Sequence, residues 1–439
     1  MSALNTGETK MPENLEAASI VLRNPWSAIA IFGLTFVMIS FRKMKLLPIG
    51  RPSAALFGAV LMVIFGVVTP EEAYALVNWD TICLLLGMMI IAEHLRAAKF
   101  FDKFSGLFEK INSPFVLLVL ISGFAALASS ILVNDPVCVV LTPIVLEICR
   151  RKRLNPFPYL VVLATSSNIG SALTLTGNPQ NMIIGSVSKL GFMRFVYVML
   201  LPFFACMIIN IGLAALYYKK DLVLTESSKA SVPDSVLSGD FCEHEEALRS
   251  KRIGFFALAI ACAGFIAGYS MAFSALTGAV VVILFHRKDP SVLLAKIDWS
   301  LLLFFSALFV VIGGLQTSGL SHLLASKSLE LISGTLSAQV WIFSGITLVG
   351  SNLLSNVPFV LLASSSVRAM ENSELFWYLL AFVSTIAGNL TIFGSVANMI
   401  VAEGAGDKCK VGFWAFAKFG AVSAILCILA GAAILFATA

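Results

Sequence analysis

Two stretches of short hydrogen-bonding residues interrupt this apolar chain, and a shorter polar break precedes each of them. The first stretch, Ala164 to Asn181, reads ATSSNIGSALTLTGNPQN and follows the break SSILVNDP. The second, Ser384 to Ile400, reads STIAGNLTIFGSVANMI and follows the break SNLLSNVP. A membrane protein tolerates unwound backbone only where it is buried in protein or lines a cavity. We therefore expect all four breaks to meet at one polar site.

The side chains of these breaks are mainly amides and hydroxyls, which bind a small solute through hydrogen bonds rather than through charge. A helix break also frees backbone carbonyls for a cation and N–H groups for an oxyanion or a hydroxyl. Gly170 and Gly177 should allow the first stretch to unwind. In the alternative interpretation these residues only join helices, as Ser, Thr and Asn often do in membranes. The candidate solute-binding residues are Asn134, Ser167, Asn168, Ser171, Thr174, Gly177, Asn178, Gln180, Asn181, Ser355, Asn356, Asn389, Thr391, Gly394, Ser395 and Asn398.

Asp135 is the only carboxylate in the four breaks, and Val357 takes the corresponding position in the second half. An ionised Asp at mid-membrane costs about 2.5–3.5 kcal/mol on insertion scales, so such a residue usually serves a proton or ion path. We interpret Asp135 as the proton carrier. It could instead cap the helix that follows the break, and the two roles are compatible.

The composition predicts an all-α polytopic membrane protein. Hydrophobic residues make up 58% of the 439 residues and charged residues 13%, and the mean hydropathy is +0.92. The net charge of +5 comes from loop lysines and arginines and does not point to nucleic acid. The eight cysteines form no C-x-x-C pair, and no histidine has a partner at metal-ligand spacing, so we expect no metal site, cofactor or catalytic residue.

Matching segments indicate a duplication. ALFGAV at 55–60 returns as ALTGAV at 275–280, and Trp79 as Trp299, both at an offset of 220. The same comparison pairs Asn134 with Asn356 and Asn168 with Asn389. We expect a polar tail at 1–22 without a cleavable signal, a first repeat at 23–220, a flexible linker at 221–250 and a second repeat at 251–439.

The apolar run at 114–149 differs from the other runs. Basic residues flank both of its ends, so both should lie on the cytoplasmic face. Its second arm, Val137 to Cys149, would be only about 20 Å long against a core of about 30 Å. We therefore expect a re-entrant hairpin with Asn134 at its tip, and a second hairpin with its tip at Ser355 and Asn356. Five crossings and one hairpin per half make the two halves inverted repeats.

The distribution of basic residues predicts the orientation in a plasma or inner membrane. With the N-terminus outside and the 218–252 loop cytoplasmic, 24 of the 30 basic residues fall on the cytoplasmic side. The other six are Lys10, Arg23, Lys189, Arg194, Lys327 and Arg368.

The remaining acidic residues have simpler structural interpretations. Asp80 and Asp298 are expected to cap helices or to anchor them at the interface. Glu93 should pair with Arg96. Glu147 and Glu403 should lie near basic loops. Cys138 is expected to be a packed thiol rather than a ligand.

The segments ATSSNIGSALTLTGNPQNMIIG and VNDPVCVVLTPIV resemble those of the ion transporter superfamily, in the branch of the arsenite permeases and the plant silicon efflux transporters. The resemblance covers 25–436. It implies two opposed hairpins and two unwound helices around a midplane site, on a domain that moves against a scaffold in a homodimer. Sodium-coupled relatives carry Ser-Asn-Thr at both hairpin tips, whereas this chain has Val133-Asn134-Asp135 and Ser355-Asn356-Val357.

No Arg or Lys lies in the four breaks, so a multivalent anion would lack a counter-charge. The sequence therefore favours proton-coupled efflux of a neutral metalloid hydroxide, such as arsenite or silicic acid. The alternatives are a sodium-coupled anion symporter, a sodium/proton antiporter or a passive channel. An intramembrane enzyme is disfavoured, since the chain has neither H-E-x-x-H nor G-x-S-x-G.

Overall fold

The computed structural model describes residues 25–40, 50–98, 106, 108, 110–222, 241–285, 289–318 and 332–438. All regular elements within these ranges are helices, which confirms the all-α prediction. The tail at 1–22 and residues 223–240 of the linker lie outside the described residues. So do His286, His322 and the side chain of His244.

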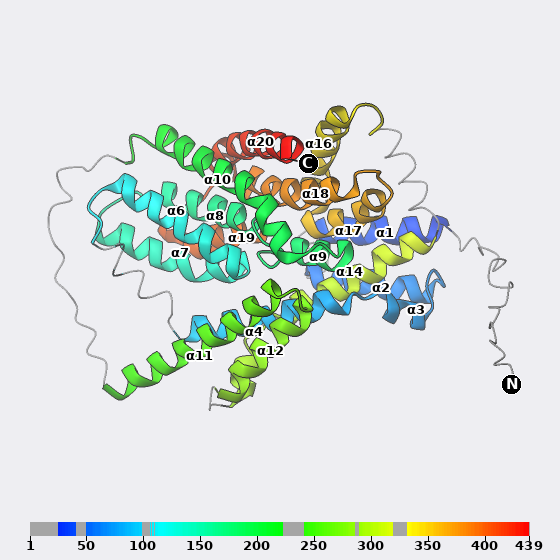
Figure 1. The fold of residues 1–439 in the computed structure, drawn as a ribbon, viewed down its shortest axis with the longest axis horizontal. Helices are drawn as coiled ribbons and strands as arrows, with labels where there is room; N and C mark the ends of the chain where they lie inside the picture. The colour runs from blue at the N-terminus through cyan, green and yellow to red at the C-terminus, as the bar shows by residue number, and fades with distance from the viewer. Residues whose placement is uncertain are drawn as a thin grey trace, which may run out of the picture.

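The helices follow the same order in the two halves of the chain (Figure 1). The first half contains α1 (Pro25–Ser40), α2 (Arg51–Ile64), α3 (Pro70–Leu76), α4 (Trp79–Ala97), α6 (Pro114–Ile131), α7 (Asn134–Arg151), α8 (Pro156–Ser171), α9 (Pro179–Ser188) and α10 (Phe192–Tyr217). The second contains α11 (Phe241–Ile266), α12 (Met271–Phe285), α13 (Pro290–Leu294), α14 (Trp299–Thr317), α16 (Leu336–Leu354), α17 (Asn356–Arg368), α18 (Ser373–Ala387), α19 (Val396–Ala405) and α20 (Phe413–Thr438). Short 3-10 turns, η3 (Gly388–Leu390) and η4 (Ile392–Gly394), link α18 to α19, and η5 (Gly406–Lys408) follows α19.

Equivalent helices begin at equivalent capping residues. Ser113 accepts a hydrogen bond from the Val116 N–H at the start of α6, and Thr335 does the same for Ala338 at the start of α16. Asp298 caps α14, as predicted. Asp80 does not cap α4, because Asn78 accepts the hydrogen bond from Thr81 and Asp80 lies in the first turn. These caps satisfy N–H groups that have no partner within the helix.

Helices of one half pack against helices of the other in reciprocal pairs. α2 packs against α14 and α12 against α4, while α7 packs against α19 and α17 against α9. α1 to α4 and α11 to α14 make up one set, here called the flanking group. α6 to α10 and α16 to α20 make up the second set, the central group (Figure 1).

The last helices of the two halves, α10 and α20, run side by side in opposite directions. Tyr218, at the end of α10, lies 5.4 Å ring to ring from Phe419, near the start of α20. At the other end, Arg194 of α10 and Thr438 of α20 line one cavity. This is the relation expected of two inverted copies, and inversion of the complete halves stays a prediction.

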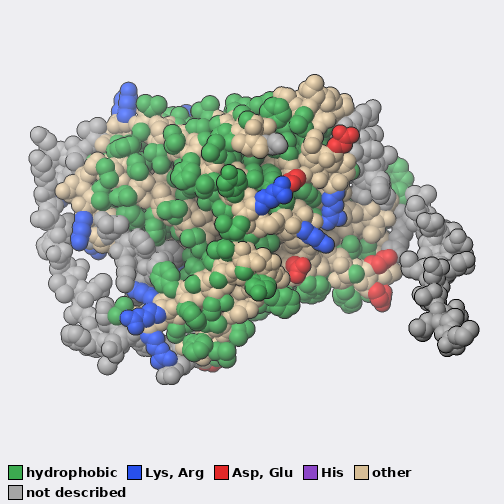
Figure 2. Space-filling view, in the orientation of Figure 1, with side chains coloured by type: hydrophobic (Ala, Val, Ile, Leu, Met, Phe, Trp, Pro, Cys, Tyr) green, Lys and Arg blue, Asp and Glu red, His purple; other side chains and the backbone are tan. Residues whose placement is uncertain are grey.

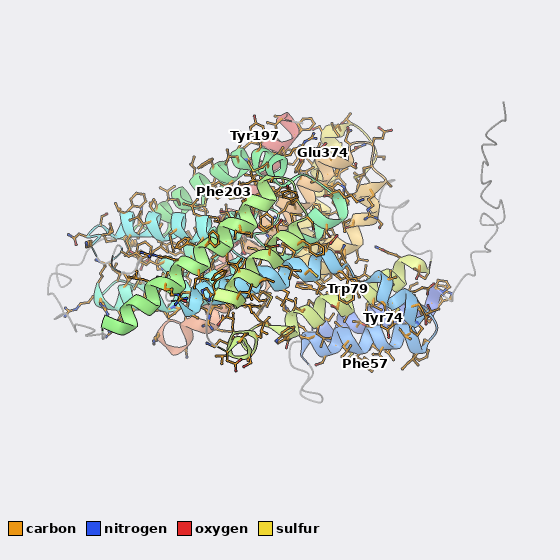
Figure 3. The ribbon with its side chains drawn as sticks, turned by 60° about the horizontal axis from the view of Figure 1, so that its bottom comes forward. Phe57, Tyr74, Trp79, Tyr197, Phe203 and Glu374 are labelled. Carbon is orange, nitrogen blue, oxygen red and sulfur yellow. The ribbon has the colours of Figure 1, made fainter. Side chains whose placement is uncertain are left out.

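The surface is suited to lipid. In the described part of the chain, α6, α10, α14, α16 and α20 are long and apolar enough to cross a membrane, and α3 with α4, bent by 53°, passes the same test as a pair, either as a broken span or as a re-entrant loop. Hydrophobic side chains cover most of the face shown in Figure 2. Phe57 and Tyr74 project from the flanking group (Figure 3).

The second arm of the first hairpin is longer than expected. It corresponds to α7, which has 18 residues and is about 27 Å long, whereas the sequence predicted an arm of about 20 Å. The number of crossings remains a prediction.

Candidate functional site

The amide of Asn168, which is buried at the end of α8, joins three of the four breaks. Its Nδ2 donates to Asn389 Oδ1 at 2.8 Å and to Asn398 Oδ1 at 3.0 Å. Its Oδ1 accepts from Asn134 Nδ2 and from Ser395 Oγ, both at 3.0 Å. The tip of the first hairpin and both unwound stretches thus meet at one side chain, which we call the amide hub.

The tip of the second hairpin reaches the same place through Asn352 and Asn356. Asn352 Nδ2 donates to the carbonyl of Ala387 at 3.1 Å, next to η3. Asn356 Nδ2 lies 3.4 Å from the position that a Cβ on Gly388 would take. Ser355, between them, has a φ of 73°, a positive value that is uncommon for a residue with a side chain and occurs here in the turn between α16 and α17.

The first unwound stretch is held by its own polar side chains. Asn178 Nδ2 donates to Ser171 Oγ at 2.9 Å and to Thr385 Oγ1 at 3.1 Å. Gln180 Nε2 also donates to Thr385, at 3.3 Å. Three further contacts join this stretch to the first hairpin. The carbonyl of Gly177 accepts from the Asn134 N–H, and Thr174 Oγ1 donates to the carbonyl of Ser130. Ser167 Oγ lies 2.7 Å from Ser129 Oγ.

The unwound stretches share one hydrogen-bond pattern, which fixes their correspondence. Asn181 Nδ2 donates to the carbonyls of the residues ten and seven positions earlier, Ser171 and Thr174. Asn398 Nδ2 likewise donates to the carbonyls of the residues ten and seven positions earlier in the sequence, Gly388 and Thr391. The local offset is therefore 398 − 181 = 217. The pairing of Asn168 with Asn389 was wrong by one helical turn, because Thr385 is the counterpart of Asn168.

The sequence offset between equivalent residues of the two halves changes between the hairpin tips and the unwound stretches. The hairpin tips, Asn134 and Asn356, are 356 − 134 = 222 positions apart. α7 has 18 residues and α17 has 13, so the first half carries five more residues before α8, and 222 − 5 = 217.

Several buried side-chain oxygens near the hub accept no hydrogen bond from any described residue. They are Asn134 Oδ1, Asn181 Oδ1, Thr347 Oγ1, Ser351 Oγ, Asn352 Oδ1 and Asn356 Oδ1. Buried polar atoms are rarely left unpaired, because each costs about 1–3 kcal/mol. Oxygens of this kind can accept from a hydroxylated solute or coordinate a cation.

Asp135 lies beside the hub but is not bonded to it. Its side chain is half-buried in the first turn of α7, and no described residue forms a hydrogen bond or an ion pair with it. The capping alternative is wrong, since Val133 occupies the N-cap without a side-chain bond. Asp135 therefore stands at the edge of the hub.

The other acidic residues largely form the expected pairs. Glu93 binds Arg96 at 2.7 Å. Glu147 binds Arg150 and Arg151, and these hydrogen bonds lower the pKa of Glu147 to about 2. Cys138 is fully buried, consistent with a packed thiol.

Three features of the site could not be recognised before the structure was known. Thr385 was overlooked because the wrong register hid its equivalence to Asn168. Asn210 joins Thr165, Ser166 and Ser423 in a second buried network, although α10 shows no break there. Gly170 does not unwind α8, because it stays helical and a Cβ there would overlap the Ala126 carbonyl of α6.

Comparison with known proteins adds the following similarities. Residues 34–379 match the family described as CitMHS, citrate transporter. A transporter of Dictyostelium discoideum named arsB is 32% identical over 93% of this chain and 91% of its own length. The silicon efflux transporter LSI3 of Oryza sativa subsp. japonica is 30% identical over 90% of this chain and 94% of its own length. The crystal structure of the YdaH transporter of Alcanivorax borkumensis, described as having an unusual topology, matches 93% of this chain and 96% of its own, with a TM-score of 0.53 and 14% identity.

Proposed function

The chain belongs to the CitMHS citrate transporter family, and from the uncharged hub and the similarity to arsB and LSI3 we propose that it is a proton-coupled exporter of a neutral metalloid hydroxide such as arsenite or silicic acid. The family and the similar proteins are transporters and not enzymes. It is therefore a secondary transporter in the membrane. The solute, the coupling ion and the mechanism are the parts that we propose.

The amide hub supports this solute class. The hub offers amide donors, amide and hydroxyl acceptors and freed backbone groups, and no Lys or Arg lies in any of the four breaks. A small solute with several hydroxyls can donate to Asn134 Oδ1 and Asn356 Oδ1 and accept from neighbouring amides. A multivalent anion would need a counter-charge that these breaks do not supply.

The packing supports alternating access of the elevator type. The hub lies within the central group, where both hairpins and both unwound stretches contact one another. We propose that this group moves against the flanking group and that Asp135, at its edge, carries the proton. A homodimer is proposed from the family resemblance, and light scattering of the detergent-solubilised protein tests it.

Flux into proteoliposomes tests the proposal. Arsenite, silicic acid, sulfate and citrate are each offered with a pH gradient, a sodium gradient or neither. We expect arsenite or silicic acid to accumulate against its own gradient only when the pH gradient is present. Accumulation that follows sodium and ignores pH would contradict proton coupling, and equilibration without accumulation would indicate a channel.

Sodium-coupled anion transport is the second candidate. The unpaired oxygens of Asn134, Ser351 and Asn356 favour it, because side-chain oxygens are the ligands that hard cations prefer. The matching family is also described by the name of an anion, citrate. Citrate uptake that requires sodium in the same flux assay would establish this function instead.

A further inference from the structure

A cavity of about 200 Å³ lies between the flanking and central groups, away from the amide hub. Asn78 and Gln316 of the flanking group line one side, and Ser364, Ser365 and Arg368 of α17 line the other. Val187 of α9 completes the lining from the central group. The cavity thus presents amides, hydroxyls and one guanidinium over an otherwise apolar wall.

The cavity adjoins the same two helices whose first turns carry the site. α17 begins at Asn356 and reaches the cavity at Leu361, five residues or about 8 Å further along. α9 begins after Asn178 and reaches it at Val187. A solute in the cavity would therefore lie alongside both helices whose first turns carry the site.

The equivalent position in the first repeat is closed. The counterpart of Ser364 is Thr142 (364 − 222), and the counterpart of Val187 is Gly404 (187 + 217). A Cβ on Gly404 would lie 3.2 Å from Thr142 Cγ2, so α7 and α19 touch where α17 and α9 border the cavity. At the offset of 220, an ion pair between Glu93 and Arg96 replaces Gly313 and Gln316.

From this asymmetry we propose that the cavity is a vestibule through which small oxygen-rich solutes reach the amide hub, and that Arg368 attracts those with negative charge. Arg368 is exposed and lines the cavity, and its Nη2 lies 3.5 Å from the carbonyl of Val187 on the facing helix. A cationic group in a lined cleft raises the local concentration of anions. The proposal rests on the transport function: the vestibule would serve either candidate solute class, and recruitment by Arg368 would add to the second candidate, anion transport.

Cysteine labelling at equivalent positions tests the vestibule. Ser364→Cys and Thr142→Cys are matched, because each native hydroxyl donates to the carbonyl four residues earlier in its helix. In detergent-solubilised protein, where the reagent reaches both faces, we expect a methanethiosulfonate to modify Ser364→Cys at least about tenfold faster than Thr142→Cys. Equal rates, or no modification of Ser364→Cys, would overturn the proposal.

The charge of the reagent tests Arg368. The measured quantity is the rate with the anionic sulfonatoethyl reagent divided by the rate with the cationic trimethylammonium reagent. This ratio should be several-fold higher for Ser364→Cys than for a free thiol in solution. Adding Arg368→Gln should abolish this preference. Arg194→Gln is the control, because Arg194 is also exposed but pairs with Glu374 at 2.8 Å, away from the vestibule. A preference that survives Arg368→Gln would exclude the role of Arg368. Neither labelling result depends on which solute or ion is transported, so failure of the proposed function would be seen separately.

Discussion

Asn168 can hold a polar site together without charge because an amide donates and accepts at the same time. Its two donated and two accepted bonds connect the first hairpin tip, the first stretch and the second stretch. An Asp could not donate to Asn389 and Asn398, and a Lys could not accept from Asn134. An amide is therefore the side chain that can hydrogen-bond both to the acceptor oxygens of Asn389 and Asn398 and to the donor groups of Asn134 and Ser395.

Asn168→Ala should remove solute binding and lower stability, because it leaves buried amides without partners at about 1–3 kcal/mol each. Asn210→Ala is the matched control, since Asn210 is equally buried and bonded to Thr165, Ser166 and Ser423. Thermal unfolding with and without arsenite or silicic acid measures both effects. We expect both variants to melt earlier and only Asn210→Ala to keep the solute-induced shift. A retained shift in Asn168→Ala would place the site elsewhere.

Asp135→Asn should abolish transport driven by a pH gradient while leaving the protein folded. The carboxylate makes no hydrogen bond with a described residue, so its loss removes no contact that supports the fold. Asp80→Asn is the control, because Asp80 is exposed in the first turn of α4. Flux under a pH gradient, with circular dichroism for folding, measures the outcome. If proton coupling persists in Asp135→Asn, Glu93 becomes the next candidate.

Helices and breaks were predictable because each leaves a local signature. The polar residues of the two stretches identify where α8 and α18 end, and Asn134 and Asn356 identify the starts of α7 and α17. The register between the repeats was not predictable from the matches at an offset of 220 alone, because the offset is 222 at the hairpin tips and falls to 217 after the five extra residues of α7. The segment Asn-Met-Ile at 181–183 and again at 398–400 carries the offset of 217 in the sequence. The hydrogen bonds of Asn181 and Asn398 identify the same register in the structure.

Gly170 should matter for packing between elements. A methyl group there would overlap the Ala126 carbonyl and force α8 away from α6, and overpacking of this kind costs about 1–3 kcal/mol. Gly123 of α6 has no heavy atom within 4 Å of its Cβ position, so Ala should fit there and favour the helix by up to about 1 kcal/mol. Thermal unfolding should therefore show Gly170→Ala melting earlier than the native protein and Gly123→Ala not earlier. Equal melting temperatures would mean that α6 and α8 can separate at little cost.

At the scale of the whole molecule, the repeat explains why one site forms from distant segments. The reciprocal contacts of α7 with α19 and of α17 with α9 hold the two halves together, so the breaks at the ends of these helices are drawn together at the centre. Cys206 and Cys427, at equivalent positions of α10 and α20, each donate to the other's carbonyl at 3.6 and 3.7 Å. A reciprocal contact of this kind is expected at the axis of two inverted copies. Duplication could be predicted from sequence, whereas these reciprocal contacts depend on tertiary packing.

The distribution of basic residues predicts the orientation of the molecule in the membrane, and this prediction can be tested at two exposed positions. Glu371 lines one cavity with Arg194 and Thr438, so it lies at the end of the molecule where α10 begins and α20 ends. Lys220 follows the opposite end of α10. Because α10 is a 26-residue span of about 39 Å, these two positions should face opposite sides of the bilayer. In intact cells an impermeant thiol reagent should label Glu371→Cys and should reach Lys220→Cys only after permeabilisation, with the native cysteines as background. The reverse pattern would invert the orientation that the basic residues predict and would place Arg368 and its vestibule on the cytoplasmic side.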